Sequence, residues 1–330
     1  MDDEKLTNLL SEITIKQTDK IAKKILKDLK KTAPDMLEEL RYEREEFEAR
    51  LKMRWRKPLN DLETLIHMSL ESGEMFCEDF EKRAEKENNI TFYAIKRIHA
   101  RAVQISNEIL TLLKSGYCEG ALGRWRTLHE LSVICILLCN NLNNELSKRY
   151  LDYSLVEIYN EEKSFFDTAN KKTKKQEKNL QELKKQYDAL ISIYGKEFAK
   201  SNGWAYSVIK KEKITFRDIE ELVDMSHLRP YYKKACSTTH ASPKGDLYKL
   251  GIIDEFIDEV IPCGPSNYGL SIPGQNTAIS LNTITAHFLN LYISMDSLTN
   301  SKIINLLTNE ILLKFDKTQH QIELEELDEN

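Results

Sequence analysis

The amino-acid sequence predicts an all-α protein, built as a multi-helix bundle with a projecting charged helical hairpin and a long loop near the C-terminus. Three observations support this prediction. Only 11 Gly and 7 Pro occur in 330 residues, and so few breakers favour long helices over many short strands. Apolar residues recur at three- and four-residue spacing along most of the chain. Patterns typical of strands are almost absent.

The organisation that we expect has three parts. Charged N-terminal helices cover 1–57, a helical bundle covers 58–315, and an acidic tail covers 316–330. Within the bundle, residues 161–200 include a Lys- and Glu-rich segment with only a narrow stripe of Leu and Tyr. This composition predicts an exposed helical hairpin that projects from the body. The tail, which ends "IELEELDEN", is expected to fray.

The N-terminal part is expected to hold two helices. The apolar spacing predicts an amphipathic helix over 4–31, and a second, highly charged helix restarts after Pro34 and runs to Trp55. Pro58 suits the first turn of the next helix, because its missing N–H is harmless there. That helix is expected to continue toward Phe80.

The bundle is predicted from successive apolar stripes. A long helix is expected over 92–114, with Gly116 as its C-terminal stop. The stretch "CEGALGRWRTLHELSVICILLC", residues 118–139, predicts a mostly apolar helix, and 145–165 predicts another.

The C-terminal half is expected to combine short helices with one long connection. Short helices are predicted over 215–223 and 228–243. Residues 262–276 hold three of the seven Pro and three of the eleven Gly, which predicts a long surface loop. A last apolar helix is expected over 277–298.

Composition and charge limit the class of protein. A hydrophobic content of 41% and a charged content of 31% are typical of soluble globular proteins. The six cysteines form no C-x-x-C pair and are expected to be reduced. The longest apolar run, "VICILLC", is far short of the roughly 20 residues of a membrane span. We therefore expect a cytoplasmic protein without a membrane partner.

The net charge of −5 gives no global basic field that would attract nucleic acid. Two local basic runs, 16–31 and 171–185, are nevertheless present. They are either solvated helix faces or contacts to a phosphate backbone.

The apolar stretch 118–139 contains four ionisable residues, Arg124, Arg126, His129 and Glu130. At roughly 100° per residue, Arg126 and Glu130 lie within about 40° of each other, and His129 flanks the same face. Arg124 is some 140° from His129 around the axis. We therefore expect Arg126, His129 and Glu130 to form one buried cluster, with Arg124 pointing elsewhere.

Two interpretations of this cluster stay open. An i, i+4 ion pair between Arg126 and Glu130 would simply lock the core. Alternatively, Arg126 binds phosphate, and the His129 imidazole moves a proton close to neutral pH. Together these two groups would suit metal-independent RNA cleavage, in which the 2′-hydroxyl attacks its own phosphodiester.

A second candidate patch is "CSTTHASPKG", which contains Ser237, Thr239, His240 and Lys244. Hydroxyls, an imidazole and an ammonium near a helix end could bind an anion, although His240 could equally cap or pack the helix. No pair of E-x-x-H motifs and no phosphate- or dinucleotide-binding glycine motif occurs. We therefore expect neither a metal nor a cofactor.

Four stretches together resemble a bacterial family of helical proteins of unknown function. They are "RLKMRWRKPLNDLETLI", "ISNEILTLLKSGYCEGALGRWRTLHE", "YYKKACSTTHASP" and "CGPSNYGLSIPG", and the similarity extends from Arg50 to Leu298. The family pattern is G-Y-x3-A-x4-R-T-L-x-E followed by S-x-x-x-H. By position it falls on Gly116, Tyr117, Ala121, Arg126, Glu130, Ser237 and His240, with "STTH" one residue shorter than the pattern. The resemblance implies an all-helical fold and no particular activity.

The segment "RWRTLH" also resembles the R-x4-H motif of the HEPN ribonucleases, which occur in toxin and antiphage systems. This resemblance implies that Arg124 and His129 are catalytic, and that two copies of the motif face each other in a homodimer. Arg126, Glu130 and His240 are further candidate catalytic residues, and Tyr117, Ser237, Thr239 and Lys244 are candidates for substrate binding.

Two hypotheses for the function follow. One is a HEPN-like ribonuclease effector of a bacterial toxin or antiphage system, which acts on RNA or with another defence protein. The other is a non-catalytic helical sensor that binds a partner protein or nucleic acid.

Overall fold

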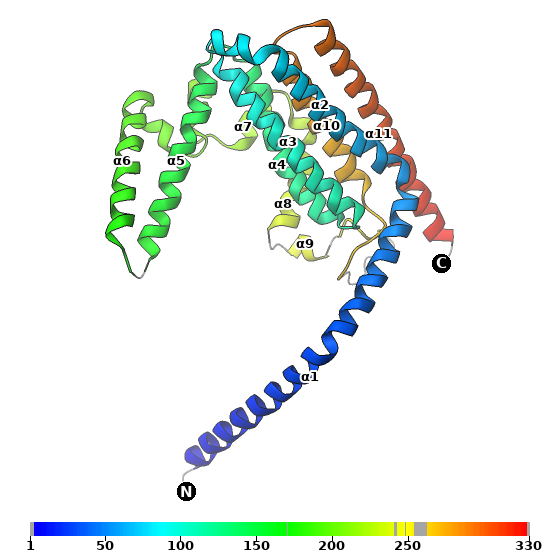
Figure 1. The fold of residues 1–330 in the computed structure, drawn as a ribbon. Helices are drawn as coiled ribbons and strands as arrows, with labels where there is room; N and C mark the ends of the chain where they lie inside the picture. Colours follow the sequence, from blue (N-terminus) through cyan, green and yellow to red (C-terminus); the bar gives the residue numbers. More distant parts are fainter. Residues whose placement is uncertain (1–2, 170, 241–242, 248, 254–262, 329–330) are drawn as a thin grey trace. The chain divides into compact units, whose positions relative to one another are not determined.

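The computed structural model describes residues 3–169, 171–240, 243–247, 249–253 and 263–328 (Figure 1). Within these residues the chain forms eleven α-helices, three short 3-10 helices and no strand, which confirms the all-α prediction. The chain divides into two units, Met1–Arg54 and Trp55–Asn330.

The first unit is one helix, α1 (Asp3–Arg54), with Pro34 in its interior. The prediction of two helices separated at Pro34 is therefore wrong. A proline removes one backbone hydrogen bond and crowds the preceding turn. The residues on both sides are mainly Lys, Glu and Leu, which favour helix, and the helix continues through the proline.

The second unit has a core of five long helices. These are α2 (Arg56–Lys86), α3 (Ile90–Lys114), α4 (Cys118–Cys139), α10 (Ser271–Leu289) and α11 (Met295–Asp328). Helix α4 packs against both α3 and α10, so it lies at the centre of the bundle. The buried Trp125 indole on α4 donates from Nε1 to Asn276 O at 2.9 Å and to Ser280 Oγ at 3.0 Å.

The turn between α3 and α4 confirms the predicted stop at Gly116. Gly116 has a φ of +80°, which a glycine adopts without steric cost. Its N–H donates to Leu113 O at 3.1 Å, and Tyr117 N donates to Leu112 O at 2.9 Å. This pair of bonds is a Schellman motif, which ends α3 and lets α4 begin two residues later.

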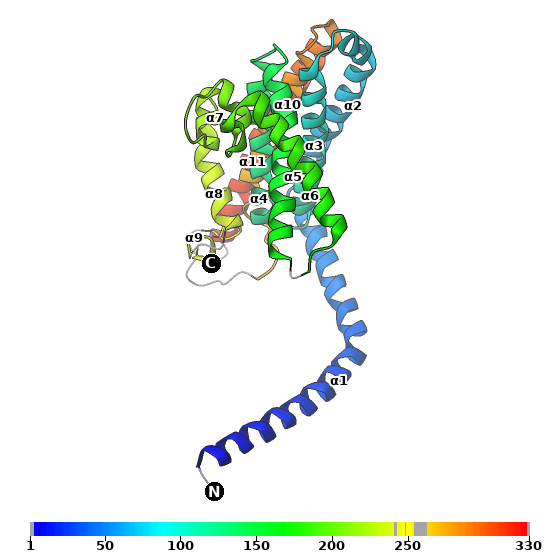
Figure 2. The same cartoon turned by 90° about the vertical axis from the view of Figure 1, so that its left-hand side faces the viewer.

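A hairpin of α5 (Glu145–Thr168) and α6 (Lys174–Tyr194) extends from the bundle (Figures 1 and 2). Its arms meet through the rings of Tyr159 and Tyr187, whose centroids are 4.5 Å apart. No residue of α6 is buried. The first arm begins well before the predicted limit at 161, because α5 also packs on α3.

Short elements connect the hairpin to the last two core helices. They are η1 (Lys196–Ala199), η2 (Gly203–Ser207), α7 (Phe216–Leu222), η3 (Ser226–Leu228), α8 (Arg229–Thr239) and α9 (Pro243–Leu247). Helix α7 begins with a capping box, in which Asp218 N donates to Thr215 Oγ1 at 3.3 Å and Thr215 N donates to Asp218 Oδ2 at 2.8 Å. Helices α7 and α8 both pack on α4.

The predicted loop 262–276 is confirmed for residues 263–270, which form no helix, and is wrong for residues 271–276. Pro262 lies outside the described residues, and α10 already begins at Ser271. The prediction failed there because a proline and a glycine, which usually indicate a loop, are both compatible with the helix. Pro273 occupies the first turn of α10, where its missing N–H is harmless. Gly274 allows a close helix contact, because a Cβ at this position would lie 2.3 Å from Phe315 Cζ on α11.

The C-terminal residues also differ from the expectation. The predicted helix 277–298 is the end of α10 and the start of α11, and α11 continues to Asp328 instead of ending in a frayed tail. Phe315 and Ile322 of α11 are buried. Gly269 N donates to Gln319 Oε1 at 3.2 Å, so these contacts hold the helix against the body.

The buried His99 makes the stability of the bundle depend on pH. Its ring packs against Phe288, and its Nε2 lies 3.2 Å from Thr285 Oγ1. Burial lowers the pKa of His99 to about 4. Between this value and the ordinary value of about 6.5, the unfolded chain binds a proton that the folded protein does not bind.

We therefore expect the free energy of unfolding to fall by up to about 3 kcal/mol as the pH decreases from 6.5 to 4 because of His99 alone. Urea unfolding of the wild type and of His99→Gln across this range measures the effect. The difference between the two proteins should shrink as the pH decreases. A difference that does not vary with pH would contradict the assignment.

Candidate functional site

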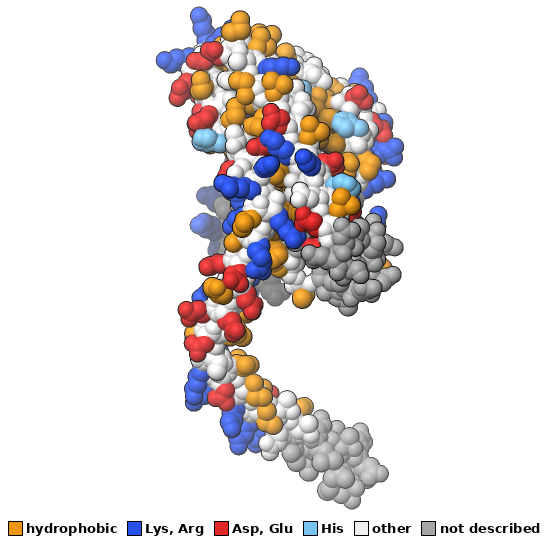
Figure 3. Space-filling view, turned by 90° about the vertical axis from the view of Figure 1, so that its right-hand side faces the viewer, with side chains coloured by type: hydrophobic (Ala, Val, Ile, Leu, Met, Phe, Trp, Pro, Cys, Tyr) orange, Lys and Arg blue, Asp and Glu red, His pale blue; other side chains and the backbone are white. Residues whose placement is uncertain are grey.

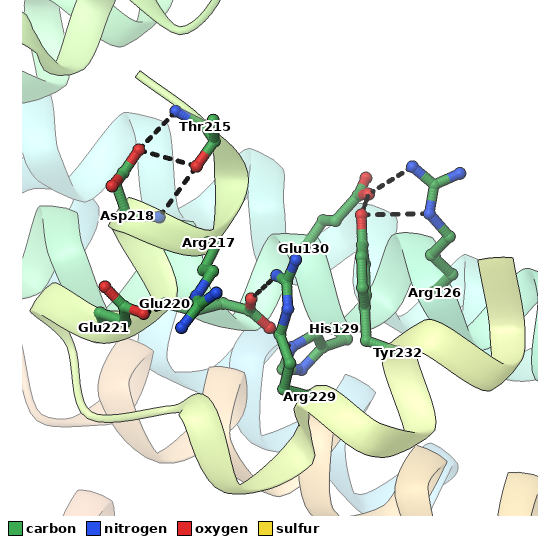
Figure 4. Close-up of polar contacts among 10 residues, drawn as sticks. All are labelled: Arg126, His129, Glu130, Thr215, Arg217, Asp218, Glu220, Glu221, Arg229 and Tyr232. Atoms are coloured by element: carbon green, nitrogen blue, oxygen red, sulfur yellow. Dashed lines mark hydrogen bonds and ion pairs between the residues drawn. The ribbon is translucent and has the colours of Figure 1, made fainter. Parts of the chain in front are cut away.

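Arg126 and Glu130 of α4 form a closed polar network with Tyr232 of α8 (Figure 4). Arg126 Nη2 lies 3.1 Å from Glu130 Oε1. Arg126 Nε donates to Tyr232 Oη at 3.1 Å, and the same hydroxyl donates to Glu130 Oε1 at 2.6 Å. Burial and the hydrogen bond to Glu130 raise the pKa of Tyr232 well above its ordinary value. The phenol therefore stays protonated and links the two charged groups.

His129 belongs to a second network, which joins α4 to α7 and α8. Its Nε2 lies 2.8 Å from Glu220 Oε1, and both side chains are 0% exposed. The other oxygen of Glu220 accepts a hydrogen bond from Arg229 Nη1. The His129 ring stacks on Trp125, with centroids 5.2 Å apart. Its Nδ1 has no hydrogen-bond partner within the described part of the chain.

The predicted single cluster of Arg126, His129 and Glu130 is therefore two clusters. The ring of Tyr232 lies beside His129, with centroids 5.7 Å apart, and it also contacts the Arg126 guanidinium. The buried ion pair is not Arg126–Glu130, whose side chains are 30% and 31% exposed. His129 is buried because α7 and α8 cover its part of α4. Arg126 lies at the edge of the covered region.

Arg124 points away from His129, as the helical angle predicts. Its guanidinium pairs with Glu108 on α3. His129 instead contacts Glu220 on α7. The two residues of the R-x4-H motif therefore contact different elements within one chain, and the imidazole is sealed from solvent.

In the second predicted patch, the hydroxyl groups bond mainly to backbone carbonyls at the end of their own helix. Ser237 Oγ donates to Lys234 O at 2.7 Å, and Thr239 Oγ1 donates to Ala235 O at 2.9 Å. His240 is the exposed C-terminal cap of α8, and Lys244 is exposed on α9. Residues 241 and 242 of this patch lie outside the described residues.

A cavity of about 830 Å³ lies between α3, α4, α5 and the η2 segment. Arg126, Glu130 and Tyr232 form part of its wall. His129 and His240 do not line it, and neither do the predicted substrate-binding residues. Tyr117 instead borders a smaller cavity of about 220 Å³ near Glu119 and Ser266.

The cavity combines cationic and aromatic groups that the sequence analysis did not single out. Arg97 and Arg101 of α3 lie on its wall, four residues apart on one face, and both are exposed. Neither guanidinium forms a hydrogen bond or ion pair with any residue that the structure describes. Burial raises the pKa of Glu157, and the nearby Arg101 opposes this shift. The aromatic part of the wall comprises Tyr150, Tyr153, Trp204, Phe216 and Tyr232.

Two further properties restrict the chemistry of the described residues. No three His, Cys, Asp or Glu side chains among them converge in an arrangement that could hold a metal ion. In the same residues, no helix has both the length and the apolar character required to cross a membrane.

The two networks should contribute unequally to stability. We expect His129→Ala to lower the free energy of unfolding by about 3–5 kcal/mol, because it leaves the fully buried Glu220 with one partner fewer. Arg126→Ala on the same helix should cost about 1 kcal/mol, because Glu130, its ion-pair partner, is 31% exposed and can reach water. Urea unfolding of both variants measures these losses. Equal losses, or a larger loss for Arg126→Ala, would contradict the assignment of the buried pair.

Comparison with known proteins identifies a family but no activity. Residues 92–255 match the Family of unknown function (DUF5677). Neither curated proteins nor solved structures gave a match. The matched segment begins near the start of α3 and includes the wall of the cavity and both polar networks. It is shorter than the predicted similarity from Arg50 to Leu298. Residues 92–255, just under half of the chain, are therefore similar to a family of unknown function.

Proposed function

We propose that the protein is a non-catalytic binding protein, whose cavity takes up a phosphate-bearing nucleobase ligand. Such a ligand is either a free nucleotide or a segment of single-stranded RNA, which share the same recognition chemistry. The proposal corresponds to the sensor hypothesis from the sequence, with the binding site moved to the cavity wall. The observation that carries it is the pair Arg97 and Arg101 on a wall that also contains five aromatic residues.

The size of the cavity supports a ligand of this kind. Ligand pockets typically have volumes of about 300–1,000 Å³ and combine an apolar lining with a few placed polar groups. The volume of about 830 Å³ falls in this range. Arg97 and Arg101 supply guanidinium groups, whose planar fork matches phosphate oxygens. Tyr150, Tyr153 and Trp204 border the same space, and aromatic rings are the usual surfaces for base stacking.

The charges on the wall favour an anion. Arg126 is already paired with Glu130, so this pair contributes little net charge. Arg97 and Arg101 then outnumber Glu157, which leaves a local excess of positive charge. Because these two arginines are exposed and lack an ion pair among the described residues, a phosphate would not have to displace a protein carboxylate.

The ribonuclease hypothesis stays a prediction, and the arrangement of its residues does not favour it. A general base must reach the proton that it removes, either directly or through one water molecule. His129 is 0% exposed, and Glu220 occupies its Nε2. Arg124 is held by Glu108 on another helix. For this reason we place binding, and not cleavage, at this site.

The test is titration of the purified protein with AMP, UMP and a short single-stranded RNA. Calorimetry or fluorescence anisotropy measures the binding. We expect at least one of these probes to bind. The double variant Arg97→Ala/Arg101→Ala should weaken binding by about 10-fold or more, because charge-assisted hydrogen bonds contribute about 1.5–3 kcal/mol each. Arg56→Ala removes an exposed arginine of α2 outside the cavity and should leave the affinity unchanged.

Two results would contradict the proposal. One is the absence of binding to all three probes, and the other is an affinity that depends equally on Arg56 and on the cavity arginines. A protein that cleaves the RNA, and loses this activity in a folded Arg124→Ala variant, would replace the proposal with the ribonuclease hypothesis. Comparing the nucleotides with the RNA separates the two sources of the ligand.

A further inference from the structure

Helix α1 carries an exposed apolar stripe. Ile25, Leu29, Met36 and Leu40 are each 50–58% exposed. An isolated helix gains little from propensity alone, and helices in proteins are stabilised mainly by burying such a face. A helix of 52 residues with an uncovered apolar stripe therefore requires a surface to pack against.

The spacing of the stripe indicates another long helix as that surface. Ile25 and Met36 are eleven residues apart, and so are Leu29 and Leu40. Ile15, Leu26 and Leu37 repeat the same interval on the adjoining side, and they are 60%, 52% and 41% exposed. Eleven residues make three turns of about 3.67 residues each, so the stripe runs nearly straight along the helix. Two helices with this period can remain in contact over many turns.

The charges on α1 are divided between its two halves. Residues 16–31 contain seven Lys and two Asp, and residues 35–48 contain seven acidic residues and two Arg. The two segments therefore carry formal charges of +5 and −5. Figure 3 shows this division along the helix, with Lys and Arg near one end and Asp and Glu toward the other. Within the described residues, none of the seven lysines forms an ion pair, so their charges are not neutralised within the chain.

We propose that α1 pairs in antiparallel orientation with α1 of a second copy of this chain. A two-fold axis near Thr32 and Ala33 places the basic segment of each helix beside the acidic segment of the other. In this register the residue numbers of opposed positions sum to about 65, as in an antiparallel coiled coil. Ile25 then lies opposite Leu40, and Leu29 lies opposite Met36.

The same register places oppositely charged segments side by side. At about 100° per residue, Lys20, Lys27, Glu38 and Glu45 lie on the face of α1 away from the apolar stripe. The attraction therefore acts between the whole segments 16–31 and 35–48, and not through ion pairs at the seam. A parallel pair would instead align the two basic segments with each other and the two acidic segments with each other, which is repulsive. An extended polyanion would be attracted by 16–31 but repelled by 35–48. A second copy of the chain is the partner that matches both halves.

The first test is the mass of the full-length protein by light scattering and sedimentation, with two charge-reversal variants. The basic-segment variant carries Lys20→Glu, Lys27→Glu and Lys30→Glu, and the acidic-segment variant carries Asp35→Lys, Glu38→Lys and Glu45→Lys. We expect the wild type to be a dimer, and each variant alone to dissociate with a dissociation constant raised at least 10-fold. An equimolar mixture of the two variants should form heterodimers, because the reversed charges match again.

The second test determines the orientation, in a Cys263→Ser background that removes the exposed native cysteine. Ala33→Cys lies near the proposed axis and should form a disulfide between two copies under mild oxidation. Lys20→Cys lies far from its own counterpart and should not. Efficient cross-linking at both positions would indicate parallel helices and overturn the proposal.

The remaining outcomes are equally decisive. A wild type that stays monomeric at about 100 µM would overturn the proposal, and so would charge-reversal variants that dimerise as well as the wild type. Circular dichroism and thermal unfolding serve as controls, since the six substituted positions are all exposed. Loss of the dimer with an unchanged melting transition of the bundle would support the proposal.

Discussion

The arrangement of the candidate site depends on one buried interaction, between His129 on α4 and Glu220 on α7. Glu220 is completely buried, and a buried carboxyl group is costly unless hydrogen bonds compensate for the water that it loses. The imidazole of His129 and the guanidinium of Arg229 occupy both of its oxygens. Because Arg229 begins α8, this interaction holds two short helices against the centre of the bundle.

The position of Tyr232 follows from this constraint. It lies one helical turn after Arg229 on α8, and its hydroxyl reaches Arg126 and Glu130 at the edge of the covered region. The guanidinium of Arg229 also lies 5.4 Å from the Tyr232 ring centroid. The buried network of His129, Glu220 and Arg229 thus helps to hold Tyr232 in the network beside the cavity. Tyr232, whose ring lies beside His129, is also part of the cavity wall that contains Arg97 and Arg101. Arg97 and Arg101 are the only wall arginines in the described residues without a carboxylate partner.

The sequence was informative where local chemistry decides the structure. The stripe in 92–114, the glycine at 116 and the Thr215 cap have local causes, and the structure reproduces them. Breakers were less reliable, because Pro34 and Gly274 are both accommodated inside helices. The helical angle correctly separated Arg124 from His129. It could not show which face of α4 would be covered, because Glu220 and Arg229 lie about 90 residues away or more along the chain.

The two proposals concern separate units, and each rests on how charge is distributed. In the bundle, Arg97 and Arg101 are positive groups beside an open cavity. In α1, opposite charges are divided between two halves of an exposed helix. Surface charges are common and do not by themselves indicate a binding site. In each case the apolar surface beside the charges is what indicates one. That surface is the aromatic wall in the first case and the eleven-residue stripe in the second.

Amide hydrogen exchange on the wild type and on Glu220→Gln tests the central interaction most directly. The substitution keeps the shape of the side chain but removes the charge that Arg229 contacts. We expect faster exchange confined to α7 and α8, because these helices lose their attachment to α4 while the core retains its packing. Unchanged exchange in α7 and α8, or an equal increase throughout α3, α4 and α10, would contradict the account.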